Sequence, residues 1–344
     1  MTNSSEEMDT SKPYKLIPFP DELPSLKPPA GHDKFLDNCL HGTLFLTLTV
    51  KTPLHISTGV VVMGEDISNS SIPLIQTMTQ GVKKELIIQG SSLKGCIRAV
   101  YEALTNSTLG VASKEVRDNI SNKKRLPCLK KEELCPASRI FGAMNCQGLV
   151  KFTDAKCEQV YSIGFMPSLY SPQPQFSDRT FNSEYFDDNE QVRGRKFYYQ
   201  TNRAIDSGEK GISVQQAGTE YIFTTSLQFM NLKSEELGTL LIILGQDPQY
   251  PIALKVGAGK PIGMGTMTVE ITETRVIQGK KELCDRYSTY TPPETEFLTG
   301  SLQQEFIEKQ IKAAKSNLIE ITQLEELKNV LGYPTNRQPP EGVY

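Results

Sequence analysis

The spacing of apolar and polar residues predicts most of the regular structure. Alternation predicts three strands, at 42–50 (GTLFLTLTV), 219–230 (TEYIFTTSLQFM) and 266–274 (TMTVEITET). Shorter apolar runs predict two further strands, at 60–63 and 148–153. Helical spacing predicts helices at 91–104, 234–244 and 301–331, the last as one long helix or two shorter ones ended by Gly332 and Pro334. The composition of 64–71 predicts a loop, and that of 140–142 an apolar turn.

The order of these elements predicts the fold class. Strand, helix, strand, insertion, strand, helix, strand is the βαββαβ order of a ferredoxin-like domain. We therefore expect an α+β protein with a modified ferredoxin-like (RRM-like) domain over 39–280, including a long insertion at about 155–218. Residues 1–38, rich in proline, serine and charge, should form an extended or partly disordered N-terminal arm. Residues 281–344 should form a C-terminal helical extension.

The stretch IIQGSSLKGCIRAVYEAL, residues 87–104, carries an unusual distribution of charge. Ser91 or Ser92 is a good N-cap for the helix, because a hydroxyl can accept a bond from a free N–H of the first turn. Lys94 and Arg98 follow near the N-terminus of the helix, where the dipole favours anions instead. A bound anion such as a backbone phosphate would resolve this conflict. The alternative is that both side chains simply extend into solvent.

Composition narrows the class of protein. The 344 residues have a formal net charge of −3, so binding to nucleic acid would require a local basic surface. No apolar run approaches the roughly 18 residues of a membrane span, and the N-terminus lacks the charge order of a signal peptide. We therefore expect a cytoplasmic protein without a membrane partner. Seven cysteines, with no C-x-x-C pair, predict reduced thiols rather than disulfides or a structural zinc site.

Two basic segments are candidates for binding RNA. The run LKVGAGKPIGMG places Gly257, Gly259 and Lys260 on a loop where backbone can approach a ligand closely. It is not a P-loop, since proline follows the lysine, and a tight loop with a β-bulge is the alternative. The run RGRKFYYQ places Arg193 and Arg195 beside aromatic residues, which suits stacking on single-stranded RNA. A strand with a solvated charged end is the alternative interpretation.

Candidates for catalysis are few. Glu65 and Asp66 follow Gly64 in the predicted loop, where a carboxylate could hold a metal ion or orient a ribose hydroxyl. A solvated loop acid is the alternative. His55 could act as a general base, although a structural imidazole fits its surroundings better. No Ser or Cys lies in a recognisable nucleophile motif, so a catalytic triad is not supported.

Taken together, these motifs resemble the RAMP superfamily, the repeat-associated proteins of CRISPR systems. The similar segments are TVKTPLHISTG, IIQGSSLKGCIRAVYEAL, CPASRIFGA with GLVKFTDA, RGRKFYYQ, AGTEYIF and VGAGKPIGMGTMTVEI. The opening PYKLIPFP and HDKFLDNCLHG look like backbone subunits of the type III-D branch. The resemblance covers about 14–274 and implies a ferredoxin-like domain with a thumb hairpin and further insertions.

The resemblance also implies a function and a set of partners. It implies a guide-RNA-binding backbone subunit of a type III effector ribonucleoprotein, with guide RNA, target RNA and other subunits as partners. RNA contacts would come from the start of the helix at 91–104 and from the two basic segments. The residues are Ser91, Ser92, Lys94, Arg98, Arg193, Arg195, Gly257, Gly259 and Lys260.

The resemblance leaves the chemistry open. Asp66 would be the catalytic residue if the chain cuts target RNA with Mg²⁺ or Mn²⁺. A non-catalytic organising subunit, a metal-independent guide-processing endoribonuclease that uses His55, and a small-molecule enzyme that uses the Gly-rich loop are alternatives. Some relatives carry zinc near a C-P-x-C-x-x-F-G stretch, but Ser138 replaces the second cysteine here, which does not favour zinc.

Overall fold

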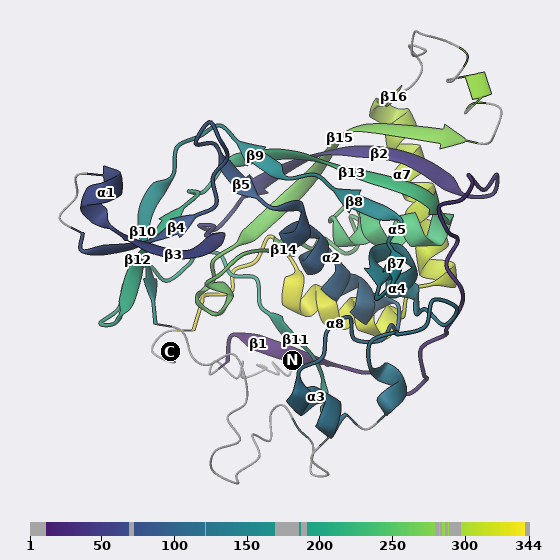
Figure 1. The fold of residues 1–344 in the computed structure, drawn as a ribbon, viewed down its shortest axis with the longest axis horizontal. Coiled ribbons are helices and arrows are strands. Elements are labelled where there is room, and N and C mark those ends of the chain that lie inside the picture. The colour runs from purple at the N-terminus through teal and green to yellow at the C-terminus, as the bar shows by residue number, and fades with distance from the viewer. Residues whose placement is uncertain are drawn as a thin grey trace, which may run out of the picture.

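The computed structural model describes residues 12–68, 72–120, 122–168, 186, 191–278, 282, 284–285, 288 and 297–340. Within these residues the largest sheet joins eight strands (Figure 1). They are β2 (Leu40–Val50), β5 (Leu86–Ile88), β8 (Val150–Phe152), β9 (Ala155–Cys157), β13 (Ile222–Leu232), β14 (Leu254–Lys255), β15 (Thr266–Gln278) and β16 (Phe297–Leu298).

The topology of this sheet confirms the predicted fold class. β2 pairs antiparallel with both β13 and β15, and β13 pairs antiparallel with β8. Helix α2 (Gly90–Leu104) separates β2 from β8, and α5 (Ser234–Ile243) separates β13 from β15. Taking β2, β8, β13 and β15 as strands one to four, the spatial order is 4-1-3-2, that of a ferredoxin-like βαββαβ domain.

The alternating strands and the amphipathic helices build one core. Leu44, Leu46 and Leu48 of β2 are almost completely buried, as the alternation of that strand requires. Helices α2 and α5 lie on one side of the sheet (Figure 1). The side chains at the predicted helical spacing in α2 are all buried: Leu93, Ile97, Val100, Tyr101 and Leu104.

The C-terminal segment forms two helices, α7 (Gly300–Asn317) and α8 (Ile321–Leu331). The break at 318–320 resolves the choice between one long helix and two shorter ones, and Gly332 ends α8 as predicted. Helix α7 packs along α5, and α8 packs against α2, β1 and β11. Among the described residues, no helix combines the length and apolar character needed to cross a bilayer.

A second sheet projects from the ferredoxin-like domain (Figure 1). Its strands, in spatial order, are β10 (Ser162–Pro167), β12 (Gly211–Gln216), β4 (Leu74–Met78) and β3 (Ser57–Met63). The predicted insertion thus pairs with a segment that precedes α2. In the N-terminal arm, β1 (Tyr14–Pro18) pairs with β11 (Gly194–Tyr198). The remaining short elements are α3 (Lys114–Asn119), α4 (Pro136–Phe141), β6 (Gly142–Ala143), β7 (Cys146–Gln147) and two 3₁₀ turns, Lys123–Arg125 and Lys260–Ile262.

Two local predictions were wrong. The loop expected from residue 64 begins instead with a one-turn helix, α1 (Gly64–Ser68), with Glu65 and Asp66 in its first turn. Acidic residues in a first turn interact favourably with the helix dipole. The apolar turn expected at 140–142 is the end of α4, which begins with Pro136 at its first helical position. Both helices are too short to show a helical period in the sequence.

Candidate nucleic-acid interface

The N-terminus of α2 is capped by a residue from a distant segment. The helix begins at Gly90, preceded by Gln89, and neither Ser91 nor Ser92 is its N-cap as the sequence predicted. Asp154 Oδ1 accepts a hydrogen bond from the Gly90 N–H at 2.8 Å. A Cβ at residue 90 would lie 2.3 Å from the Phe152 carbonyl oxygen, so only glycine fits there. The anion at this helix terminus is therefore a carboxylate of the chain itself.

The two cations of this helix also have partners within the protein. Lys94 Nζ donates to the Val150 carbonyl at 3.0 Å, and burial, reinforced by the neighbouring Arg98, lowers the pKa of Lys94. Arg98 Nε donates to Glu102 at 2.7 Å, and its Nη1 donates to the Gly142 carbonyl at 3.0 Å. An ammonium has three donors and a guanidinium five, so these bonds leave capacity for a phosphate.

The structure brings the Gly-rich loop beside α2. Cys96 Sγ of α2 donates to the carbonyl of Lys255, at the start of the loop, at 3.3 Å. Gly257 has a φ of +80°, and a Cβ there would lie 2.5 Å from the His55 carbonyl oxygen. Gly259 has a φ of +68°, and its Cβ would lie 2.4 Å from the Met264 sulfur. The left-handed backbone favours glycine at both positions, and close packing on backbone adds to this at Gly257. Lys260 follows them on a half-buried 3₁₀ turn.

The exposed face of α2 beside this loop carries only small side chains. Ser91, Gly95 and Ala99 are exposed at helical spacing. A Cβ built on Gly95 meets no atom within 4 Å, so the space over the helix is open there. A flat helix surface of this kind lets a polymer backbone lie close to the protein.

The basic and aromatic run at 193–198 is used mostly inside the protein, which corrects part of its predicted role. Arg195 is 8% exposed, donates to the Ser107 carbonyl and lies 4.9 Å from the centre of the Phe19 ring. Lys196 lies 4.1 Å from the Tyr14 ring centre and 4.9 Å from that of Tyr198, and burial lowers its pKa to about 8. The run's own rings are also engaged within the protein: Phe197 is buried, Tyr198 lies beside Lys196, and the Tyr199 ring centre lies 3.8 Å from the Arg337 guanidinium.

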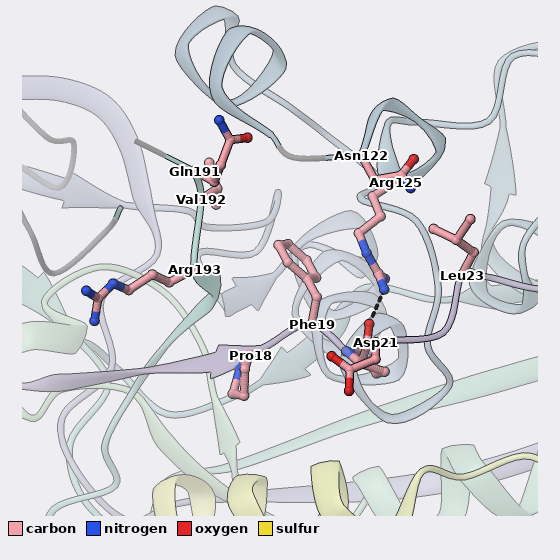
Figure 2. Close-up of a pocket in the computed structure, with 10 residues that line it drawn as sticks. Pro18, Phe19, Asp21, Leu23, Asn122, Arg125, Gln191, Val192 and Arg193 are labelled. Carbon is pink, nitrogen blue, oxygen red and sulfur yellow. Dashed lines mark hydrogen bonds between the residues drawn. The ribbon is translucent and has the colours of Figure 1, made fainter. Parts of the chain in front are cut away.

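Of the two arginines in this run, Arg193 has an exposed side chain. Its Nε donates to the Phe186 carbonyl at 2.7 Å. It borders a cavity of about 620 Å³ that also contacts Phe19 and Arg125. Figure 2 shows the Arg193 guanidinium pointing away from Phe19 and Arg125. Arg193 is therefore exposed while Arg195 is buried, and the two side chains have different partners.

The two catalytic candidates lie in contrasting environments. Asp66 is exposed on α1, at the outer end of the projecting sheet and away from α2 (Figure 1). His55 is completely buried, its Nδ1 lies 2.6 Å from the Gln215 carbonyl, and burial lowers its pKa. This is the structural imidazole that the sequence favoured, and an enclosed ring cannot reach an RNA strand.

The cysteines do not assemble a metal centre within the described residues. Cys128 and Cys135 are buried around the Thr108 hydroxyl, at 3.4 and 3.2 Å. Cys135 Sγ also lies 3.3 Å from the Ser138 hydroxyl. No group of three or more His, Cys, Asp or Glu side chains in the described parts of the chain could hold a metal ion.

Sequence reasoning missed three features of this region. Asp154, which caps α2, lies in a GLVKFTDA segment whose aspartate gives no hint of a contact with residue 90. Lys255 is almost completely buried beneath the Gly-rich loop, where burial and then Lys260 lower its pKa to about 7. Arg117 of α3 borders a cavity that also contacts Lys94 and Arg98. The basic composition of the segment 107–133 was the only signal for Arg117.

Comparisons with known proteins found one family model and a similar solved structure. A family model described as the RAMP superfamily matches residues 47–268. No curated protein matches the chain significantly. A chain in the "Cryo-EM structure of the Type III-B Cmr-beta bound to cognate target RNA" is similar, with a TM-score of 0.36 and 14% sequence identity. That match covers 70% of the present chain and 61% of the other, so the chain spans about three fifths of that protein's length.

Proposed function

The chain belongs to the RAMP superfamily, and on this premise we propose that it is a guide-RNA-binding backbone subunit of a type III CRISPR effector ribonucleoprotein. Its partners are then the guide RNA, the target RNA and the other subunits of that complex, in the cytoplasm. Sequence readout would come from base pairing, while the protein holds the RNA backbone. Because the net charge of the protein is −3, binding RNA requires a local basic surface.

The observation that carries the proposal is the open face of α2 beside the Gly-rich loop. Ser91, Gly95 and Ala99 present little bulk to solvent. Lys94 and Arg98 lie on the same turns of α2 as these small residues, and Lys260 lies on the adjoining Gly-rich loop. RNA phosphates lying along this face would meet a hydroxyl, a bare helix surface and three cations. Phosphate contacts of this kind fix position without reading sequence.

The test uses a position where substitution does not disturb the fold. Gly95→Glu adds an acidic side chain into open space and replaces glycine by a better helix former. We expect unchanged or raised stability and RNA affinity lowered on the order of tenfold, since phosphates are repelled. Leu302→Glu, at a 63% exposed position of α7, is the matched control and should bind RNA normally. Equal affinity of both variants for a guide-length RNA would refute the proposal.

We further propose that Asp66, together with Glu65, cuts target RNA in the assembled complex with Mg²⁺ or Mn²⁺. Both carboxylates are exposed on a projecting part of the molecule. Mg²⁺ is commonly held by one or two carboxylates plus phosphates of the substrate, so these two side chains suit a site completed by RNA. Bound there, the ion would polarise a phosphate oxygen of the target.

The matching experiment compares Asp66→Ala with Asp206→Ala, a change at another exposed aspartate. In the complex reconstituted with Mg²⁺, we expect Asp66→Ala to lose target cleavage while guide binding is retained, and Asp206→Ala to cut normally. Cleavage at every position by Asp66→Ala would instead favour a non-catalytic organising subunit. The burial of His55 argues against guide processing through that residue.

A further inference from the structure

A cavity of about 680 Å³ opens beside Lys94 and Arg98. One wall comes from α2, and the others come from residues 110–117, 127–129 and 138–148. The elements α2, α4 and β7 lie together in Figure 1, and α2 packs against α4. The volume is in the range typical of small-ligand sites, and it far exceeds what one or two waters occupy.

The charged side chains that line this cavity are all basic. Lys94, Arg98 and the exposed Arg117 border it, whereas none of the described residues that line it is acidic. Glu102 binds Arg98 Nε, and burial raises the pKa of Glu102 against the effect of Arg98. Three cations around one opening, in a chain that is acidic overall, favour an anionic ligand.

The rim of the cavity is apolar, although it faces solvent. Val111, Leu129 and Met144 are 90%, 68% and 65% exposed, and they come from three separate loops. Phe141, almost completely buried, forms part of the inner wall. Exposed apolar side chains that converge on one opening indicate a surface that a ligand covers. Planar groups such as nucleobases suit contacts of this kind.

We propose that this cavity binds one unpaired nucleotide unit, with the base against the apolar rim and the phosphate on Lys94, Arg98 and Arg117. The inference rests on the proposed RNA-binding function, because Lys94 and Arg98 belong to both surfaces. An RNA strand lying along α2 passes the opening and can place one nucleotide in it. A free nucleotide offers the same chemistry, and an acidic peptide of a partner protein is the competing occupant.

The test is photochemical crosslinking of the full-length chain to a single-stranded RNA in which 4-thiouridine replaces uridine. A parallel sample contains 4-thiouridine 5′-monophosphate alone. Crosslinked residues are identified by mass spectrometry, which does not require a unique register of the RNA. We expect crosslinks within 127–129 or 141–148. If only the RNA sample gives crosslinks, the nucleotide in the cavity comes from an RNA strand. If the monophosphate sample gives them too, the cavity also binds free nucleotides.

Variants at the exposed rim give an independent measurement. Leu129→Asp with Met144→Asp should abolish these crosslinks and weaken RNA binding on the order of tenfold, since the base loses apolar contacts and the added carboxylates repel phosphate. Val160→Asp, at a 74% exposed position outside the cavity, is the matched control and should change neither. Arg117→Gln should make the slope of log affinity against log salt shallower by about 0.7, the value for one phosphate on a single strand.

The outcomes separate this inference from the function on which it rests. Salt-dependent RNA binding with no crosslinks in the cavity segments would overturn the inference and leave the RNA-binding function intact. Loss of a co-purifying protein subunit in the rim variant, with RNA affinity unchanged, would overturn it in favour of the peptide. Absence of any RNA binding by the wild-type chain would overturn both.

Discussion

Several side chains that the sequence marks as RNA ligands have partners inside the protein. Arg195 is enclosed with Phe19 and Ser107, and Arg98 forms an ion pair with Glu102. Lys94 donates to a backbone carbonyl. Reversing the charge of such a residue leaves its buried partner unsatisfied, which costs stability whether or not RNA binds. Exposed neutral positions are therefore the better probes of the interface.

The cap on α2 gives the first prediction. Asp154→Ala removes the acceptor of the Gly90 N–H and a carboxylate at the positive end of the helix dipole. We expect the free energy of unfolding in urea to fall by about 1 kcal/mol, the usual cost of losing an N-cap. Asp154→Asn keeps an oxygen acceptor and should lose less. Asp206→Ala serves as the control at an exposed aspartate, and equal stability of the three variants would contradict the assignment.

Lys255 gives a prediction about pH. Its Nζ donates to the Gly263 carbonyl and the Thr266 hydroxyl, both at 3.1 Å, and burial lowers its folded-state pKa from 10.5 to about 7. Between those values the unfolded chain binds more protons than the folded one, so this group makes stability rise with pH. The destabilisation is fully present below pH 7 and fades as the pH rises toward 10.5.

Lys255→Met removes that titration. Above pH 7 the unfolding free energy of the variant should rise less steeply than that of the wild type, with a difference on the order of 1 kcal/mol per pH unit. Urea unfolding between neutral and alkaline pH, for both proteins in the same buffers, measures this difference directly. Parallel pH profiles would show that Lys255 keeps an ordinary pKa.

Packing of the helices depends on close approach at one glycine. Helix α7 crosses α5 at Gly238, where an added Cβ would lie 1.9 Å from the Gln310 carbonyl oxygen and 2.9 Å from the Ala314 Cβ. The absence of a side chain therefore lets the two backbones touch. Gly95 in α2 has the opposite setting, because a Cβ there would face open space.

The two glycines make a matched pair for mutation. Gly238→Ala must push α7 away from α5, and we expect a loss of about 1–3 kcal/mol or more in unfolding free energy. Gly95→Ala should instead stabilise the protein by about 0.5–1 kcal/mol, since alanine restricts the unfolded chain and favours helix. Thermal or urea unfolding of both variants tests this. Equal effects of the two substitutions would show that the contact with Gln310 does not limit the packing.

The sequence was most informative where one periodic pattern determines one element. The alternation in β2 and the spacing of Leu93, Ile97 and Val100 in α2 predicted both elements and the faces that they bury. Contacts between distant segments were not predictable, because no local pattern encodes them. Asp154 contacts Gly90 from 64 positions away, and Arg195 looks the same in a sequence whether it faces Phe19 or solvent.

The family match ends at residue 268, but the packed structure does not. Helix α7 lies along α5, and the Glu320 N–H donates to the Leu104 carbonyl at the end of α2. The Gln200 N–H donates to the Val330 carbonyl of α8 at 2.9 Å. Helices α7 and α8 therefore complete the helical layer of the ferredoxin-like domain. The projecting sheet differs, since every residue of β3 except Val62 is exposed.

This contrast predicts two levels of protection in hydrogen exchange. Amides that open only by global unfolding should occur together in β2, β13, α5 and α7, because these elements bury one another's apolar side chains. Amides of β3 should exchange much faster through local opening, since few buried contacts hold that strand. Exchange followed by mass spectrometry at increasing urea distinguishes the two classes, as only global opening has a large urea dependence. Fast, urea-independent exchange across α7 would mean that the C-terminal helices are a loosely attached appendage, and that the family domain is stable without them.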